Sequence, residues 1–288
     1  MGAAIAPLYH GDRAVIATMH AKEKVIVPIA ERFLGLRIEV TTKLDTDAFG
    51  TFSRDVERTG SQLDAARAKI QAAFTERPNA RVGLASEGSF GPHPVLPFCP
   101  LEREIVVLFD RETDFELVGY HATSHTNYAH AMITEIERGL AFAAKVGFPD
   151  HGVIVTGCRD EKPAHDIALI KNAETWSELT RALNDVIAKS GTAFAETDMR
   201  AHRNPRRMRA IKRATIDLAR RARSLCPECG RPGYAVTERL SGLPCSWCKG
   251  PTMSSKADVL TCVGCGFRIE RAVKAVAADP AHCSECNP

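Results

Sequence analysis

Eight of the ten cysteines lie in the last 63 residues, as four Cys-x-x-Cys pairs separated by 15, 13 and 17 residues. Two thiolates from one such turn can occupy two corners of a zinc tetrahedron, and a second pair roughly 12 to 20 residues away supplies the other two. We therefore expect two zinc ions, each bound by four cysteines. The eight ligands are Cys226, Cys229, Cys245, Cys248, Cys262, Cys265, Cys283 and Cys286.

The order in which these pairs combine is open. Sequential pairing joins the first pair with the second and the third with the fourth, which gives two tandem ribbons. Nested pairing is the alternative, because residues 245–265 resemble a complete ribbon hairpin with strands near 258–261 and 267–269. Both schemes use all eight sulfurs in closed sites, so we expect both zinc ions to be structural. A tail so poor in large apolar residues would obtain its folding energy from the metal.

A glycine-rich strand end in the first half of the chain offers different chemistry. Glu87 follows the apolar run 82–85 and precedes Gly88 and Ser89. An acid at the rim of a sheet, followed by glycines and a serine, suits a cation held beside phosphate oxygens, with Ser89 close to the substrate. The alternative is an irregular surface loop in which Glu87 is solvated.

Further acids lie in the polar segment 43–59, which contains Asp47, Asp55 and Glu57. Several carboxylates for Mg²⁺ and a lysine for the leaving group are what metal-assisted hydrolysis of a phosphoanhydride requires. If such a site forms, Glu87 should lie within metal-bridging reach of one of these acids or of Asp198.

Asp198 and Arg200 follow the last strand of the core. They could face the same rim, as a metal ligand and a phosphate clamp. The alternative is a structural ion pair that fixes the start of the following helix.

The elements that must position these residues alternate along the chain. Apolar runs indicate strands, and apolar residues at helical spacing indicate helices. The expected strands are 13–18, 36–41, 82–85, 103–110, 115–120, 152–157, 166–170 and 192–195, and the expected helices are 25–33, 63–74, 127–146 and 176–187. This alternation predicts an α/β core with a mixed, partly parallel sheet at residues 10–198. A basic helical linker at 199–224 and a double zinc-ribbon domain at 225–288 follow.

Parts of the core resemble the inosine/xanthosine triphosphate pyrophosphatase superfamily. The resemblance rests on three segments, 15–24, 51–69 and 83–91. It implies an enzyme in which Thr18 and Lys24 contact phosphate. It also implies that Glu57 or Asp55 helps to hold magnesium and that Glu87 acts as metal ligand or base. As a whole, the chain also resembles an uncharacterised bacterial family of unknown function with this core and a cysteine-rich tail, a resemblance that implies no activity.

The charge of the chain is unevenly distributed. The net charge is +3, but residues 196–224 carry ten Arg or Lys against three acids. An attraction to nucleic acid would therefore be local to the helix at 200–223, with Arg206, Arg207, Lys212 and Arg213 as phosphate contacts. The alternative is a solvated helix that packs through an apolar stripe running from Met208 to Leu225.

Three histidines and two cysteines complete the set of reactive side chains. His121, His125 and His130 suggest a metal site, but we expect ordinary polar and capping roles for them. Cys99 has no neighbouring base in the sequence, and Cys158 is interpreted as a buried or loop thiol.

The composition, with 44% hydrophobic and 25% charged residues, is that of an ordinary soluble protein. The chain has no apolar run long enough for a membrane span and no signal peptide pattern. With cysteines clustered as metal ligands, this indicates the cytoplasm.

Two functions follow from these observations. The first is a magnesium-dependent hydrolase of nucleotides or related phosphoanhydrides, which would take a phosphate-bearing small molecule as substrate. The second is an adaptor without catalytic activity that binds nucleic acid or protein through the zinc ribbon and the basic helix. A nuclease or RNA-processing enzyme would combine both features.

Overall fold

The computed structural model describes residues 8–44 and 60–287. The chain divides into two compact units at the step from Ala219 to Arg220. The larger unit contains two sheets with their helices, and the smaller unit contains the cysteine pairs. Each unit is described separately below.

Sheet A of the larger unit has the strand order β2-β1-β3-β4-β5. β1 pairs in parallel with β2 and β3, whereas β4 is antiparallel to both of its neighbours, β3 and β5. The mixed, partly parallel sheet predicted from the sequence is thereby confirmed. Its strands are β1 (Arg13–Ala17), β2 (Arg37–Val40), β3 (Val82–Pro92), β4 (Pro100–Asp110) and β5 (Phe115–Thr123).

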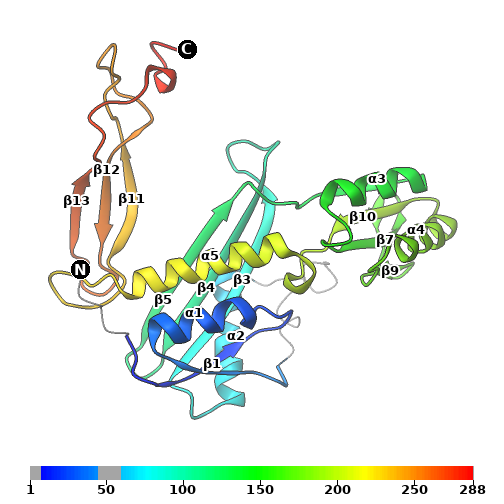
Figure 1. Cartoon of the computed structure of the whole chain (residues 1–288), viewed down its shortest axis with the longest axis horizontal. Helices are drawn as coiled ribbons and strands as arrows, with labels where there is room; N and C mark the ends of the chain where they lie inside the picture. The colour runs from blue at the N-terminus through cyan, green and yellow to red at the C-terminus, as the bar shows by residue number, and fades with distance from the viewer. Residues whose placement is uncertain (1–7, 45–59, 288) are drawn as a thin grey trace. The chain divides into compact units, whose positions relative to one another are not determined.

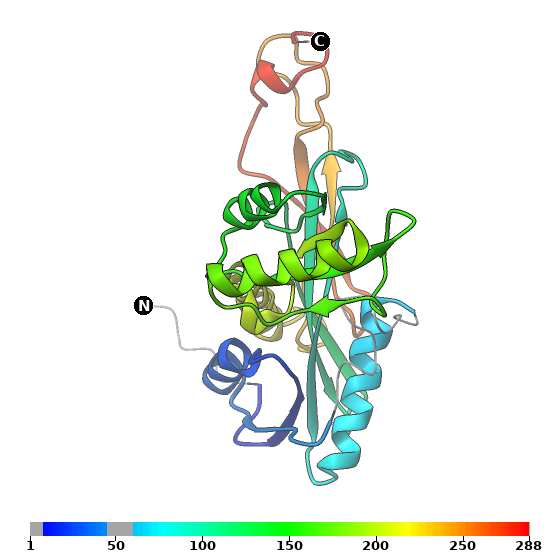
Figure 2. The ribbon, with the colours of Figure 1, turned by 90° about the vertical axis from the view of Figure 1, so that its right-hand side faces the viewer.

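Helices cover both faces of sheet A. Figure 2 shows α1 (Glu23–Leu34) and α2 (Gln62–Glu76) on opposite sides of its strands. α1 ends where Gly35 takes a left-handed conformation, which glycine adopts without steric cost. α2 begins at a capping box in which Ser61 and Asp64 satisfy each other's backbone N–H groups. Its apolar face packs on β1, β3 and β4 through Ala66, Ile70 and Phe74.

The long helix α5 (Pro205–Ala222) lies across the strands of sheet A (Figure 1). The Asn204 side chain accepts a hydrogen bond from the backbone N–H of Arg207 at 3.1 Å, so Asn204 caps the helix. Ile211 and Leu218 on α5 are completely buried. A β-carbon on Gly119 of β5 would overlap the backbone of α5 at Ala214, so helix and strand approach each other closely.

Sheet B, also in the larger unit, is antiparallel throughout, with the order β6-β10-β7-β8 and β9 beside β7. Its strands are β6 (His130–Ile133), β7 (Val153–Arg159), β8 (Lys162–Pro163), β9 (Leu169–Ile170) and β10 (Ala193–Thr197). Its core is formed with α3 (Ile136–Val146) and α4 (Trp176–Ser190).

The sequence did not predict this second sheet, and the prediction of a helix at 127–146 was wrong at its N-terminal end. Residues 130–133 form β6, and α3 begins only at Ile136. The reason is tertiary, because β6 pairs with β10 and completes a sheet that no local pattern reveals.

The smaller unit is built on an antiparallel three-stranded sheet. The strands are β11 (Ala235–Ser241), β12 (Ser255–Thr261) and β13 (Arg268–Ala272). β13 is exposed along its whole length, and in β12 only Ala257, Val259 and Leu260 are buried. The unit therefore has little apolar core of its own.

Over the described part of the chain, no helix has the length and apolar character that a membrane crossing requires.

Candidate functional site

Four cysteines of the smaller unit form a first cluster, which consists of Cys226, Cys229, Cys262 and Cys265. The Sγ atoms of Cys226 and Cys265 are 3.8 Å apart, and those of Cys229 and Cys262 are 3.7 Å apart. With Zn–S bonds of about 2.3 Å, the sulfurs of a zinc tetrahedron are about 3.8 Å apart, whereas a disulfide holds them at about 2 Å. The sulfurs thus have the spacing of ligands around one ion.

A second cluster repeats this geometry and consists of Cys245, Cys248, Cys283 and Cys286. Its sulfurs are 3.8 Å apart between Cys245 and Cys286 and 3.6 Å apart between Cys248 and Cys283. The chain therefore has two tetra-cysteine clusters that could each hold a metal ion such as zinc.

The clusters interleave along the chain. The first Cys-x-x-Cys pair joins the third and the second joins the fourth, which is neither the sequential nor the nested arrangement considered from the sequence. The antiparallel sheet accounts for this pairing. β12 leads from the second pair to the third and runs beside β11, so the third pair returns to the level of the first.

All four Cys-x-x-Cys pairs form the same turn. In each pair, the backbone N–H four residues after the first cysteine donates a hydrogen bond to the carbonyl of that cysteine. The donors are Gly230, Lys249, Gly266 and Asn287. The first three of these donors have a positive φ. In the second pair the left-handed residue is thus Lys249, a non-glycine residue.

Backbone amides also point at the sulfurs. The N–H groups of Cys265 and Gly264 donate to the Sγ of Cys262 at 3.5 and 3.3 Å. These bonds hold the pKa of the Cys262 thiol at about 6, below its ordinary value. The thiolate, the form that binds metal, is therefore favoured at neutral pH.

In the larger unit, Glu87 lies in the interior and not in a surface loop. It is 2% exposed, and its carboxylate is ion-paired with Lys69 of α2. The Gln62 side chain donates to the carbonyl of Glu87 at 3.2 Å. Nearby, Lys22 donates to the carbonyl of Ser86 at 3.3 Å, and burial lowers the pKa of Lys22 to about 8.

The other residues predicted to contact substrate lie in different settings. Thr18 is buried and its hydroxyl donates to the carbonyl of Met19 at 3.2 Å. Lys24 is exposed on α1, and it is the neighbouring Lys22 that contacts β3. Ser89 is half-buried on β3.

Asp198 is completely buried and binds Arg200, whose guanidinium donates to both carboxylate oxygens at 2.7 to 3.1 Å. Arg200 also donates to the carbonyl of Lys171 at 2.7 Å. These contacts are those of the structural ion pair considered from the sequence.

The remaining predicted metal ligands, Asp47, Asp55 and Glu57, lie outside the described residues. Within residues 8–44 and 60–287, the two cysteine clusters alone bring together three or more His, Cys, Asp or Glu side chains at metal-binding distance. The magnesium site around Glu87 therefore stays a prediction.

A buried charge cluster that the sequence did not indicate lies under α5. Arg207 and Glu104 have no exposed surface and are joined at 2.7 Å, while Glu102 is 1% exposed. Burial and the neighbouring Glu104 raise the pKa of Glu102 to about 7. Arg207 was expected on the outer, phosphate-binding face of the helix, and its burial corrects that expectation. Its position four residues before the buried Ile211 is the periodicity signal that would have revealed it.

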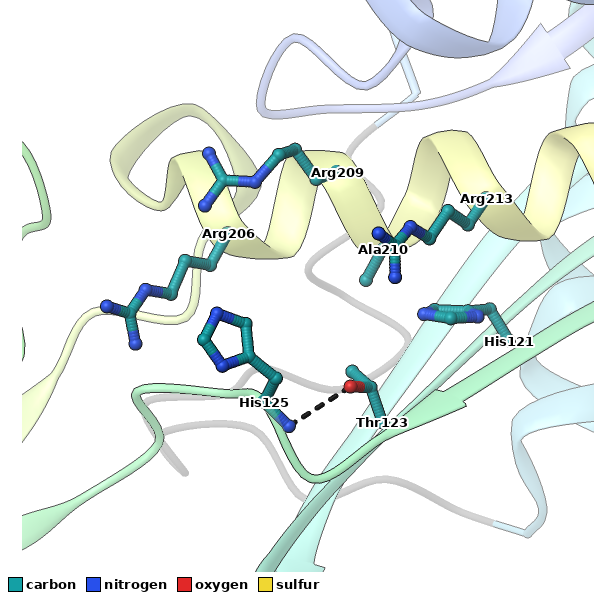
Figure 3. Close-up of a pocket in the computed structure, with 7 residues that line it drawn as sticks. All are labelled: His121, Thr123, His125, Arg206, Arg209, Ala210 and Arg213. Carbon is teal, nitrogen blue, oxygen red and sulfur yellow. Dashed lines mark hydrogen bonds between the residues drawn. The ribbon is translucent and has the colours of Figure 1, made fainter.

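Residues 206–213 of α5 and the end of β5 enclose a cavity of about 50 Å³ (Figure 3). We call this cavity the arginine pocket. It lies entirely within the larger unit. The sheet side supplies His121, Thr123 and His125, and the helix side supplies Arg206, Arg209, Ala210 and Arg213.

The pocket explains two of the three histidines considered from the sequence. His121 and His125 both line it, whereas the ring of His130 stacks on Phe194 at 5.4 Å. Burial and the nearby Arg213 lower the pKa of His121. Cys158, as expected, is a buried thiol.

Comparison with known proteins gives a family but no activity. No curated protein matches this chain. The model of a family described as Domain of unknown function (DUF6671) matches residues 70–288, which is more than half of the chain and includes the arginine pocket and all eight clustered cysteines. The chain therefore belongs to the DUF6671 family.

Proposed function

We propose that this protein is a nucleic-acid-binding protein in which α5 contacts phosphate groups and the tetra-cysteine clusters hold structural zinc. The observation that carries the proposal is the arginine pocket. Three arginines line one side of it, and none of its lining residues is acidic. Guanidinium groups bind phosphate oxygens through paired N–H donors.

The spacing of these arginines supports a polymeric ligand. Arg206, Arg209 and Arg213 recur at intervals of three and four residues, so they share one face of α5 and extend along about 10 Å of its axis. Lys212, beside Arg213, is exposed as well. A ligand with several phosphates can contact more of this row than a single phosphate can.

The test is a salt titration of binding to single-stranded and double-stranded oligonucleotides, followed by fluorescence anisotropy. The triple variant Arg206→Gln, Arg209→Gln, Arg213→Gln should bind more weakly, with a log–log salt slope smaller by about two to three. A matched control, Arg32→Gln, Arg138→Gln, Arg181→Gln, removes the same charge from exposed positions on α1, α3 and α4. An affinity that does not depend on the salt concentration would contradict the proposal, as would an equal loss of affinity in the two triple variants.

Magnesium-dependent hydrolysis of nucleotides or related phosphoanhydrides is a second candidate. It is supported by the charged residues near the point where the parallel pairing of β1 with β3 ends, at Ala17 and Ala85. Glu87 follows on β3, Lys69 of α2 is paired with it, and Lys22 contacts the carbonyl of Ser86. Ligands of α/β sheets bind at such strand ends. A phosphate-release assay over a nucleotide panel with Mg²⁺ tests it, using the wild type and Glu87→Gln. Absence of turnover, or turnover that the substitution leaves unchanged, would remove this candidate.

A further inference from the structure

The arginine pocket is concave, which distinguishes it from a flat basic surface. Its volume of about 50 Å³ is far below the roughly 300 to 1,000 Å³ of sites that enclose a drug-sized ligand. It has room for one phosphate group, but the sugar and base attached to that group would have to remain outside.

The charge around the pocket is strongly positive. Arg206, Arg209 and Arg213 line it without an acidic neighbour in the lining. Two acids lie close to His121 and both have other partners. Asp217 accepts the backbone N–H of Tyr120 at 3.0 Å, and Glu104 is paired with Arg207.

The sheet side of the pocket has an unused polar atom. The Nε2 atom of His121 is buried and has no hydrogen-bond partner among the residues that the structure describes. Buried polar atoms are nearly always paired, so an unpaired one beside a cavity indicates a ligand or a water. In Figure 3, His121 and His125 face the three arginines across the pocket.

The number of arginines in the pocket lining indicates which kind of phosphate group the pocket would bind. A phosphodiester inside a nucleic acid chain has one negative charge and two free oxygens. A terminal phosphate has close to two charges and three free oxygens at neutral pH. A small cavity lined by three arginines and by no acidic residue matches the charge of the terminal group better.

We propose that the arginine pocket binds the terminal phosphate of a single-stranded nucleic acid, with the next phosphate of the strand contacting Lys212, the exposed cation beside Arg213 on α5. This inference rests on the proposed function and specifies its ligand. A free strand end can enter a cavity of this size, whereas the backbone of a continuous duplex cannot.

The experiment compares three oligonucleotides of one sequence that have a 5′-phosphate, a 3′-phosphate or hydroxyl groups at both ends. We expect one phosphorylated form to bind about tenfold more tightly than the hydroxyl form, because only the phosphate can accept charge-assisted hydrogen bonds from the arginines. Arg209→Gln together with Arg213→Gln should reduce this preference to less than about twofold. Arg32→Gln together with Arg138→Gln should retain it.

The outcomes separate the two proposals. Equal affinity for all three oligonucleotides overturns the terminal-phosphate site and leaves nucleic-acid binding intact, whereas no binding of any of them overturns both. A nucleoside monophosphate that competes as effectively as the phosphorylated oligonucleotide would show that the ligand is a small molecule, and it would also overturn the inference. Circular dichroism of each variant verifies that these surface substitutions leave the fold unchanged.

Discussion

Glu87 and Lys69 show what a charged pair does in the interior of this protein. Both side chains are almost fully buried between α2 and β3, so each charge depends on the other for solvation. Removing one member of a buried pair leaves the other charge uncompensated, whereas replacing both with apolar groups is often tolerated. Replacing only one of these two residues should therefore reduce the stability of the folded state.

We expect Glu87→Gln to lower the free energy of unfolding by about 3 to 5 kcal/mol, since it strands the ammonium group of Lys69 in the interior. Urea unfolding of the variant measures this loss. The double variant Lys69→Met, Glu87→Leu should lose clearly less. If the double variant is as unstable as the single one, the cost does not come from the unpaired lysine.

Glu102 should make stability depend on pH. Its pKa is raised from 4.5 to about 7 by burial and by Glu104, so the folded state retains a proton that the unfolded chain has already released. Between pH 4.5 and about 7 the folded state binds more protons, and stability falls as the pH rises through this window. Below the window the contribution of Glu102 is fully present.

Glu102→Gln should flatten this dependence, because the amide resembles the protonated acid at every pH. The difference in free energy of unfolding between variant and wild type should shift in favour of the variant from pH 4.5 to pH 8, by at most about 3 kcal/mol. Urea unfolding at several pH values measures it. A difference that stays constant with pH would show that Glu102 is not the group responsible.

At the level of elements, α5 is the helix that brings the arginines to the end of β5. Its buried residues Ile211 and Leu218 pack towards sheet A, and Gly119 of β5 allows the helix backbone to approach. Any side chain at position 119 would meet the backbone of Ala214, which cannot rotate away as a side chain can.

Gly119→Ala should therefore destabilise the larger unit by about 1 to 3 kcal/mol, the usual cost of overpacking. Gly91→Ala on β3 is the matched control, because a β-carbon there meets no atom within 4 Å. Thermal unfolding of both variants checks the difference. Equal melting temperatures would mean that α5 and β5 can separate without cost.

Local sequence patterns predicted the elements whose residues interact with their own neighbours. The apolar runs at β1 and β7 both depend on residues close in sequence. Patterns failed where distant segments decide the structure. β6 is a strand because β10 pairs with it, and Arg207 is buried because Glu104 on β4 neutralises it.

The same distinction holds for the candidate sites. Eight cysteines in Cys-x-x-Cys spacing could be recognised from the sequence as candidate metal ligands, since each pair is formed by one turn. Their pairing depends on how β11 and β12 align, which the spacing does not specify. The arginine pocket joins α5 to β5 across more than 80 residues of sequence, and only the basic character of the helix was visible beforehand.

At the level of the whole molecule, the two units obtain their stability from different sources. The larger unit has apolar cores in both sheets, whereas the sheet of the smaller unit has few buried apolar residues. Metal binding to the cysteine clusters would supply the folding energy that such a core cannot. Because the clusters interleave, each ion would join segments about 35 residues apart, and the stretch of chain closed by one ion overlaps the stretch closed by the other. Loss of one ion would therefore also free part of the chain that the other ion encloses.

Paired cysteine substitutions test the interleaved arrangement. Cys229→Ser with Cys265→Ser alters a single cluster, so the purified protein should retain close to one zinc ion per chain. Cys229→Ser with Cys248→Ser alters both clusters and should leave substantially less than one. Sequential pairing would reverse these results, because Cys229 and Cys248 would then share a site while Cys229 and Cys265 would not. Zinc measured by inductively coupled plasma mass spectrometry, with two ions per chain expected in the wild type, decides between the two arrangements.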